Sequence, residues 1–246
     1  MKQTANVRVL VYDDYEAMSR AARDVFFSHV VASINTEGQA CVALSGGSTP
    51  KRMYSLLSSA GSNEPGWSHV HFFWADERCV APDDQESNFK LAWDTFLSRF
   101  PEKERNIHRI RGEAGAVPAA REYDHDLKSF FKDAVWPVFD LIILGVGADG
   151  HTASLFPGAG ALGEHAQWAV PVHVQTRKPD RVTLSLNVLK HGRHVLFLAS
   201  GPEKATILHE ILEDGNPRAL PAGLVTPADG LVTWILDREA ARLLSL

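Results

Sequence analysis

The segment 145–151 (GVGADGH) carries the clearest chemistry in the chain. Its glycines predict a sharp turn after an apolar strand, and this turn would expose Asp149 and His151 together. Histidine is the side chain whose ordinary pKa lies nearest neutrality, and a neighbouring carboxylate can fix its tautomer and orientation. The spacing therefore predicts a catalytic pair in which His151 is the base, although a histidine that only caps the following turn would give the same pattern.

The same segment also matches G-x-G-x-x-G, the pattern of dinucleotide-binding turns. The context argues against such a site. Pro157 would stop any helix within two turns, and no acidic residue ends the next candidate strand. We therefore interpret the glycines as allowing a sharp turn that exposes Asp149 and His151.

A second loop, residues 45–50 (SGGSTP), lies between an apolar run and a helical segment. Gly46 and Gly47 would let the backbone approach a ligand closely, and we expect Ser48 or Thr49 to cap the helix. Unpaired N–H groups and the positive end of the helix dipole would then favour an anion. The loop is not a Walker A sequence, and an ordinary capped turn is the alternative.

Charged residues stand at three further points where candidate elements begin or end. Asp76, Glu77 and Arg78 end an apolar strand, where charges indicate either a solvated strand end or a site. Arg181 and Lys204 lie near proline or glycine turns. Lys204 falls in the first turn of a predicted helix, where a cation is mildly unfavourable, so a bound anion nearby becomes more plausible. No set of histidines or cysteines has metal-ligand spacing, and no metal is expected.

The elements that must position these residues alternate between short apolar runs and amphipathic segments, which predicts an α/β fold with a mostly parallel sheet. Ligands of such sheets bind at the carboxyl ends of the strands, where all these loops fall. The predicted strands are Val7–Tyr12, Cys41–Ser45, His69–Asp76, Leu141–Val146, Ala169–Val174, His194–Ser200 and Val232–Asp237. The predicted helices cover 14–35, 50–60, 87–100, 117–134, 185–191, 202–213 and 237–245.

Length, charge and cysteine content limit the classes of protein. The 246 residues show no composition shift, so we expect one domain over residues 1–246. With 25 Lys and Arg against 30 Asp and Glu, the net charge is −5, which argues against nucleic-acid and anionic-membrane partners. No signal peptide or membrane span is evident, and Cys41 and Cys79 are expected to be buried, inert thiols. These features predict a cytoplasmic protein and leave its oligomeric state open, a monomer included.

Five segments, taken in order over roughly residues 40–210, resemble the 6-phosphogluconolactonases: ALSGGSTPKRMY, FFWADERCV with a following Ser87-Asn88, LGVGADGHTASLFPG, PDRVTLSLNVL and GPEKA. The resemblance implies a Rossmann-like, three-layer α/β/α fold related to the glucosamine-6-phosphate isomerases and deaminases. It also implies hydrolysis of 6-phosphoglucono-1,5-lactone to 6-phosphogluconate in the pentose phosphate pathway, without an obligatory cofactor.

The resemblance implies roles for the residues that match its motifs. His151 matches the general base, oriented near Asp149. The remaining matches are to substrate-binding positions: a phosphate loop, an acidic pair with unseparated roles, and basic positions around the anionic substrate. These are Gly46, Gly47, Ser48 and Thr49 for the loop, Asp76 and Glu77 for the pair, and Arg78, Arg181 and Lys204 for the cations. An acidic protein that binds an anion should gather these three cations in one cleft.

Two other functions stay open at this point. The related isomerase/deaminases carry a DGHIAFNEP-type sequence, whose glutamate would fall where Phe156 stands here, so the proton relay for ring opening would lack a member. A non-catalytic sugar-phosphate sensor would keep the phosphate loop and could lose the base. Because Asp149 and His151 are both present, the hydrolase is favoured over both alternatives.

Overall fold

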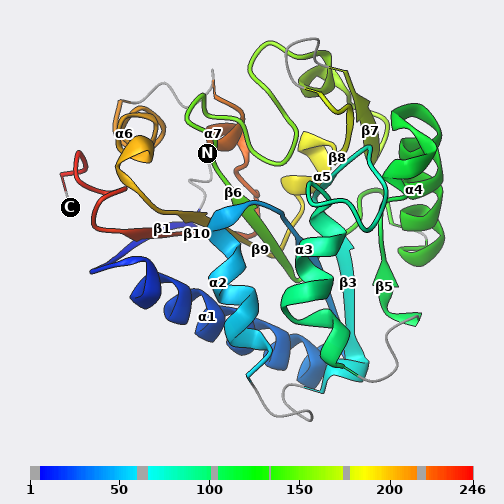
Figure 1. Cartoon of the computed structure of the whole chain (residues 1–246), viewed down its shortest axis with the longest axis horizontal. Coiled ribbons are helices and arrows are strands. Elements are labelled where there is room, and N and C mark those ends of the chain that lie inside the picture. The colour runs from blue at the N-terminus through cyan, green and yellow to red at the C-terminus, as the bar shows by residue number, and fades with distance from the viewer. Residues whose placement is uncertain are drawn as a thin grey trace.

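The computed structural model describes residues 6–59, 66–100, 105–132, 134–173, 178–214 and 220–245. A parallel, seven-stranded sheet forms the centre of this part of the chain (Figure 1). Its strands, in spatial order, are β1 (Asn6–Tyr12), β10 (Leu231–Asp237), β9 (His194–Ala199), β6 (Leu141–Gly145), β2 (Ala40–Leu44), β3 (Val70–Trp74) and β5 (Ile107–His108). The α/β class predicted from the alternation of apolar runs is confirmed.

The inner strands are mostly apolar because elements cover both faces of the sheet. Every residue of β2 and β9 is buried, whereas Val7 on the edge strand β1 is 46% exposed. In Figure 1, helix α1 (Tyr15–Glu37) runs below β1 and β10, and helix α6 (Ala205–Leu212) lies above them.

Helix α1 shows how local sequence sets an element's ends. The Asp14 carboxylate accepts the N–H of Ala17 at 2.7 Å and caps the helix, while Gly38, at φ 79°, ends it in the left-handed conformation. Between these ends, Met18, Ala22, Phe26 and Val30 recur every fourth residue and are buried. This stripe packs the helix against the sheet, next to α2 (Ser48–Leu57).

A second, antiparallel sheet was not expected from the sequence. It consists of β4 (Asp76–Arg78), β8 (Arg181–Leu184) and β7 (Ala169–Val172), and helix α4 (Ala116–Phe130) packs against β7 and β8. The predicted strand 169–174 therefore belongs to this small sheet, and its last residue, Val174, lies outside the described residues. The predicted strand 69–76 is divided at Ala75 between the two sheets.

The remaining helices are α3 (Asn88–Thr95), α5 (Leu186–Leu189) and α7 (Pro221–Leu224). The helix predicted over 237–245 is wrong. Asp237 ends β10, and the residues after it form turns. Ala241 donates to the Asp237 carbonyl at 3.1 Å, but Leu244 then bonds three residues back to Ala241, so no helix propagates through so short a segment.

Burial differs between the two cysteines. Cys41 is buried, and burial raises the pKa of its thiol to about 12; Cys79 is only half-buried, which corrects the expectation, and burial raises its pKa to about 11. Neither thiol is therefore a nucleophile near neutral pH. None of the helices described here is long and apolar enough to cross a membrane.

Candidate active site

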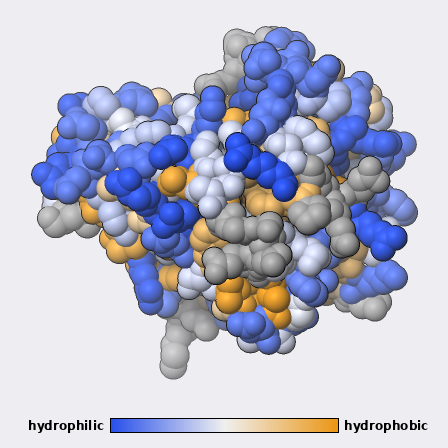
Figure 2. Space-filling model, turned by 60° about the horizontal axis from the view of Figure 1, so that its bottom comes forward, coloured by the Kyte–Doolittle hydropathy of each residue, from blue (hydrophilic) through white to orange (hydrophobic). Residues whose placement is uncertain are grey.

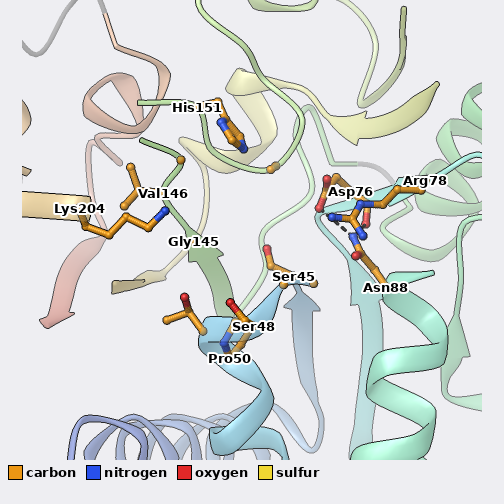
Figure 3. Close-up of a pocket in the computed structure, with 15 residues that line it drawn as sticks. Ser45, Ser48, Pro50, Asp76, Arg78, Asn88, Gly145, Val146, His151 and Lys204 are labelled. Atoms are coloured by element: carbon orange, nitrogen blue, oxygen red, sulfur yellow. Dashed lines mark hydrogen bonds between the residues drawn. The ribbon is translucent and has the colours of Figure 1, made fainter. Parts of the chain in front are cut away.

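A cavity of about 210 Å³ opens at the carboxyl ends of β2, β6 and β9, beside β4 (Figure 3). This is the edge at which open α/β sheets bind their ligands. Its walls come from loops far apart in the sequence: Ser45, Gly46, Gly47, Ser48, Thr49, Pro50, Asp76, Arg78, Asn88, Gly145, Val146, Gly147, His151, Ala153 and Lys204.

The histidine predicted as a base lies on the upper wall of this cavity in Figure 3. Its Nδ1 is 2.5 Å from Oδ1 of Asp149, and the same oxygen accepts the backbone N–H of His151 at 3.3 Å. A carboxylate at Nδ1 favours the tautomer with its proton there, which leaves Nε2 as the proton acceptor. The imidazole ring contacts Phe156, with ring centroids 4.7 Å apart and the two rings tilted by 44°. The pair can therefore act as an oriented base.

Small residues in the turn make room for this pair. An ideal β-carbon on Gly147 would lie 2.0 Å from His151 Nδ1 and 2.6 Å from Asp149 Oδ1. The turn is closed by a hydrogen bond from the Gly147 N–H to the His151 carbonyl at 2.9 Å, and the Thr152 hydroxyl donates to the Gly145 carbonyl at 2.8 Å. Gly147 thus makes room for the two polar side chains, as the sequence predicted for the glycines of this motif.

The β2–α2 loop presents backbone groups to the cavity. Gly47, at φ 97° and ψ 174°, is the N-cap residue of α2, a conformation that favours glycine. The expected side-chain cap is wrong: Ser48 and Thr49 are the first two helical residues, and no side chain caps α2. Both residues line the cavity at the start of a helix, and the unpaired N–H groups of a helix start are suited to an anion.

Two buried hydroxyls hold this loop in place. The Tyr54 hydroxyl donates to the Ser45 carbonyl at 2.7 Å and accepts the Ser45 N–H at 3.2 Å. The Ser45 hydroxyl donates to the carbonyl of Ile143 at 2.7 Å and so ties β2 to β6. The loop is therefore preorganised before any ligand arrives.

The opposite wall holds a buried polar network around Asp76, which is 6% exposed. Its Oδ2 accepts the Ser154 hydroxyl at 2.6 Å, and its Oδ1 accepts the Asn88 side-chain amide at 3.2 Å. Asn88 fits against Gly46, where a β-carbon would come within 1.7 Å of its Oδ1. Arg78 lies beside these groups and donates to the carbonyl of Glu86 at 2.6 Å (Figure 3).

Glu77, predicted with Asp76 as a substrate-binding residue, is separated from its neighbour and does not line the cavity. Its side chain is buried outside the cavity lining and accepts the N–H groups of Asn88, Phe89 and Arg78, each at 2.7 Å. Strand direction explains the difference, because adjacent residues point to opposite faces. Glu77 therefore anchors the start of α3, which carries Asn88.

Burial opposes the charge of Glu77 and outweighs these hydrogen bonds, raising the pKa of its carboxyl from 4.5 to about 7. A carboxyl with a raised folded-state pKa stabilises the protein most below pH 4.5, and this contribution is lost as the pH rises through about 7. We expect the free energy of unfolding of the wild type, relative to Glu77→Gln, to fall by more than about 1 kcal/mol between pH 5 and 8, since one pKa unit corresponds to about 1.4 kcal/mol.

Urea denaturation at both pH values measures this difference. Glu164→Gln is the matched control, because Glu164 also accepts two backbone N–H groups, from Ala166 and Gln167, but at the surface. A gap between wild type and Glu77→Gln that stays constant from pH 5 to 8, or changes as in the control, would contradict the prediction.

The three predicted cations do not all reach the cavity. Arg78 and Lys204 line it from opposite sides, but Arg181 does not. Arg181 lies opposite Arg78 in the antiparallel pair of β4 and β8, and its guanidinium carbon is 5.3 Å from the centre of the Phe156 ring. It therefore lies against Phe156, the ring that also contacts His151. Lys204 ends the short helix η6 (Pro202–Lys204), directly before α6.

Sequence reasoning missed three polar residues of the site. Ser45 stood in the loop 45–50 without a role, and Asn88 was quoted only in the Ser87-Asn88 pair of the resemblance; Ser87 is the N-cap of α3. Ser154 stood in the segment LGVGADGHTASLFPG without a role, because its partner Asp76 is 78 residues away in the chain. Among the described residues, no three histidine, cysteine, aspartate or glutamate side chains are grouped so that they could hold a metal ion.

Fold and site together define an α/β protein with a small polar cavity and a histidine–aspartate pair at the carboxyl edge of a parallel sheet. The family model described as "Glucosamine-6-phosphate isomerases/6-phosphogluconolactonase" matches residues 13–234. The chain belongs to this family.

Relatives of known name and structure agree with this assignment. A human 6-phosphogluconolactonase is 44% identical over 174 residues, covering 70% of this chain and 67% of the human one. "Probable 6-phosphogluconolactonase 1" of Arabidopsis thaliana is 34% identical, covering 94% and 91% of the two chains. The solved 6-phosphogluconolactonase of Trypanosoma brucei superposes with a TM-score of 0.87 at 30% identity, over 98% and 100% of the two chains. A monomeric glucosamine-6-phosphate deaminase, at 23% identity and a TM-score of 0.78, shares the fold.

Proposed function

We propose that this chain hydrolyses 6-phosphoglucono-1,5-lactone to 6-phosphogluconate, the second step of the oxidative pentose phosphate pathway. The observation that carries the proposal is the His151–Asp149 pair on the wall of a cavity whose other side is the start of α2. The relatives named 6-phosphogluconolactonase support the same substrate. Ester hydrolysis needs one base and one water, and the cavity offers both a base and room for water.

The reaction follows from this geometry. Nε2 of His151 takes a proton from a water molecule while the water oxygen attacks the lactone carbonyl. The tetrahedral intermediate collapses with cleavage of the bond between the carbonyl carbon and the ring oxygen. The proton on His151 passes to that leaving oxygen, so the histidine is neutral again. Asp149 holds the imidazole and stabilises its charged form during the cycle.

The two sides of the cavity bind different parts of the substrate. Lys204 and the first turn of α2, with Gly46, Gly47, Ser48 and Thr49, bind the phosphate, because a lysine and a helix N-terminus both favour an anion. Asp76 and Arg78 face the sugar end from the side of the cavity away from Lys204, and Asn88 lies between them and Gly46. The phosphate acts as a handle that fixes the carbonyl near His151.

Aldose–ketose isomerisation with loss of ammonia is less well supported. Phe156 packs on the His151 ring, at the position where the related deaminases carry a carboxylate. A direct assay separates the functions: the lactone is generated in situ and acid release is followed, and glucosamine 6-phosphate is then offered and ammonia measured. Acid release supports the proposal. Ammonia without acid release would replace it with the deaminase, and neither product with tight sugar-phosphate binding would replace it with a sensor.

Removing the Lys204 side chain should weaken substrate binding more than it lowers the turnover rate. We expect Lys204→Ala to raise KM by about tenfold to a hundredfold, because the variant loses a charge-assisted hydrogen bond to the phosphate. The change in kcat should be smaller. Steady-state kinetics measure both constants. Lys190→Ala, which removes a lysine outside the cavity lining, is the control. An unchanged KM in Lys204→Ala would remove Lys204 from the phosphate site.

The cytoplasmic location and the absence of a nucleic-acid partner stay predictions from the sequence. Plant relatives include proteins named as chloroplastic, so membership of the family does not fix the compartment. The acidic balance of the chain still argues against a polyanionic partner. Figure 2 shows hydrophilic residues interspersed with apolar areas over one face of the molecule.

A further inference from the structure

A buried carboxylate outside the cavity is joined to the loop that carries Lys204. Asp237 ends β10, is 5% exposed and does not line the cavity. Strand β10 lies next to β9, with Leu236 opposite Ala199, so Asp237 comes level with the start of the loop that follows β9. Nothing in the proposed reaction uses this carboxylate, although buried carboxylates are costly unless they are well bonded.

The Asp237 carboxylate binds the first two residues of that loop. It accepts the Ser200 hydroxyl, and both of its oxygens lie 3.1 Å from the N–H of Gly201. A third donor, the N–H of Ala240, reaches it at 2.8 Å from the turn after β10. Three donors from two segments therefore converge on one side chain and hold the loop to the sheet.

The loop leads from these bonds directly to Lys204. Gly201 is held at φ 96° and ψ 152°, a conformation that favours glycine, and it is the N-cap residue of η6. Its carbonyl accepts the N–H of Lys204 at 3.1 Å. The direction in which Lys204 leaves the backbone is thus set three residues earlier, at the residue that Asp237 binds.

We propose that Asp237 is a positioning residue for Lys204, and that it keeps the lysine directed into the cavity before the substrate's phosphate arrives. A lysine on a flexible loop would have to be ordered by the substrate, and the cost of that ordering would weaken binding. Asp237 removes this cost without touching the ligand. The proposal rests on the proposed function, in which Lys204 binds the phosphate.

Asp237→Asn tests the role with little change of shape. The substitution replaces one carboxylate oxygen with an NH₂ group, which cannot accept the hydrogen bonds that this oxygen accepted. The loop is therefore held less firmly to the sheet. We expect KM, and the dissociation constant of 6-phosphogluconate measured by calorimetry, to rise together by about tenfold, while kcat changes less than threefold. Ser200→Ala is a second test that serves if Asp237→Asn folds poorly. It removes one donor and leaves the carboxylate, so we expect a smaller rise of KM and of the dissociation constant.

Asp140→Asn is the matched control. Asp140 is a buried carboxylate, 7% exposed, at the other end of the sheet, where it accepts the N–H of Cys41 at 2.8 Å and Nη1 of Arg193 at 3.1 Å. Its loss should lower the melting temperature without raising KM. An equal rise of KM in both variants would overturn the positioning role and leave only general stability.

A double-mutant cycle separates this proposal from the proposed function. In the Lys204→Ala background, Asp237→Asn should change KM and product affinity little further, because the group that it positions is gone. Undiminished effects in that background would overturn the proposal while leaving the phosphate site intact. If Lys204→Ala itself left KM unchanged, the phosphate assignment would fail first.

Discussion

His151→Ala is expected to lower kcat by about 10²–10⁴-fold, the usual contribution of a general base, without unfolding the protein. Nε2 of His151 is the proton acceptor that the Asp149 contact leaves facing the cavity, and a methyl group cannot replace it. The imidazole is 27% exposed at the cavity wall, so its loss empties little of the core. KM should change less than kcat, because the phosphate is held on the other side of the cavity.

The measurement is steady-state hydrolysis of lactone generated in situ, corrected for spontaneous hydrolysis, together with thermal unfolding. His173→Ala is the matched control: Nδ1 of His173 lies 2.8 Å from Asp180 in a second histidine–aspartate pair, at the surface. That variant should keep wild-type turnover. Near wild-type turnover in His151→Ala would refute its assignment as the base.

The turn that carries Asp149 and His151 could be predicted from the sequence because its parts are adjacent in the chain. Asp149 and His151 are two residues apart, and the glycines between and before them indicate a sharp turn without knowledge of the fold. The loop at Gly46 and Gly47 could be recognised for the same reason. Local backbone preferences therefore carried both predictions, and the cap assigned to Ser48 or Thr49 failed because Gly47 itself is the cap residue.

The small antiparallel sheet could not be predicted, because pairing between distant strands determines it. Strand β4 has three residues and pairs with β8 about a hundred positions later, so neither shows a long apolar run. This sheet divides the charged set 76–78: Asp76 and Arg78 line the cavity while Glu77 turns to α3. It also places Arg181 against Phe156 and outside the cavity lining. Residue type indicated charge near a site, but only strand pairing decided which charges enter the cavity.

The orientation of His151, beyond its presence, should control turnover, and Gly147 tests this point. We expect Gly147→Ala to lower kcat by about 10²-fold, since a displacement of about 1 Å at a catalytic group can cost that much. The new β-carbon would lie 2.0 Å from His151 Nδ1 and 2.6 Å from Asp149 Oδ1, so the two side chains cannot keep their contact. The affinity for 6-phosphogluconate should stay within a few-fold, because the residues of the β2–α2 loop that are proposed to bind its phosphate are unchanged.

Gly145→Ala provides a control from the same turn. Gly145 also lines the cavity, but a β-carbon there would meet nothing within 4 Å. Any general effect of replacing a glycine in this motif should appear in both variants, whereas displacement of His151 should appear only in Gly147→Ala. A crystal structure of Gly147→Ala should show the imidazole moved away from Asp149. Wild-type turnover with the contact broken would mean that Asp149 does not orient the base, and equal losses in both variants would assign the effect to the backbone of the turn.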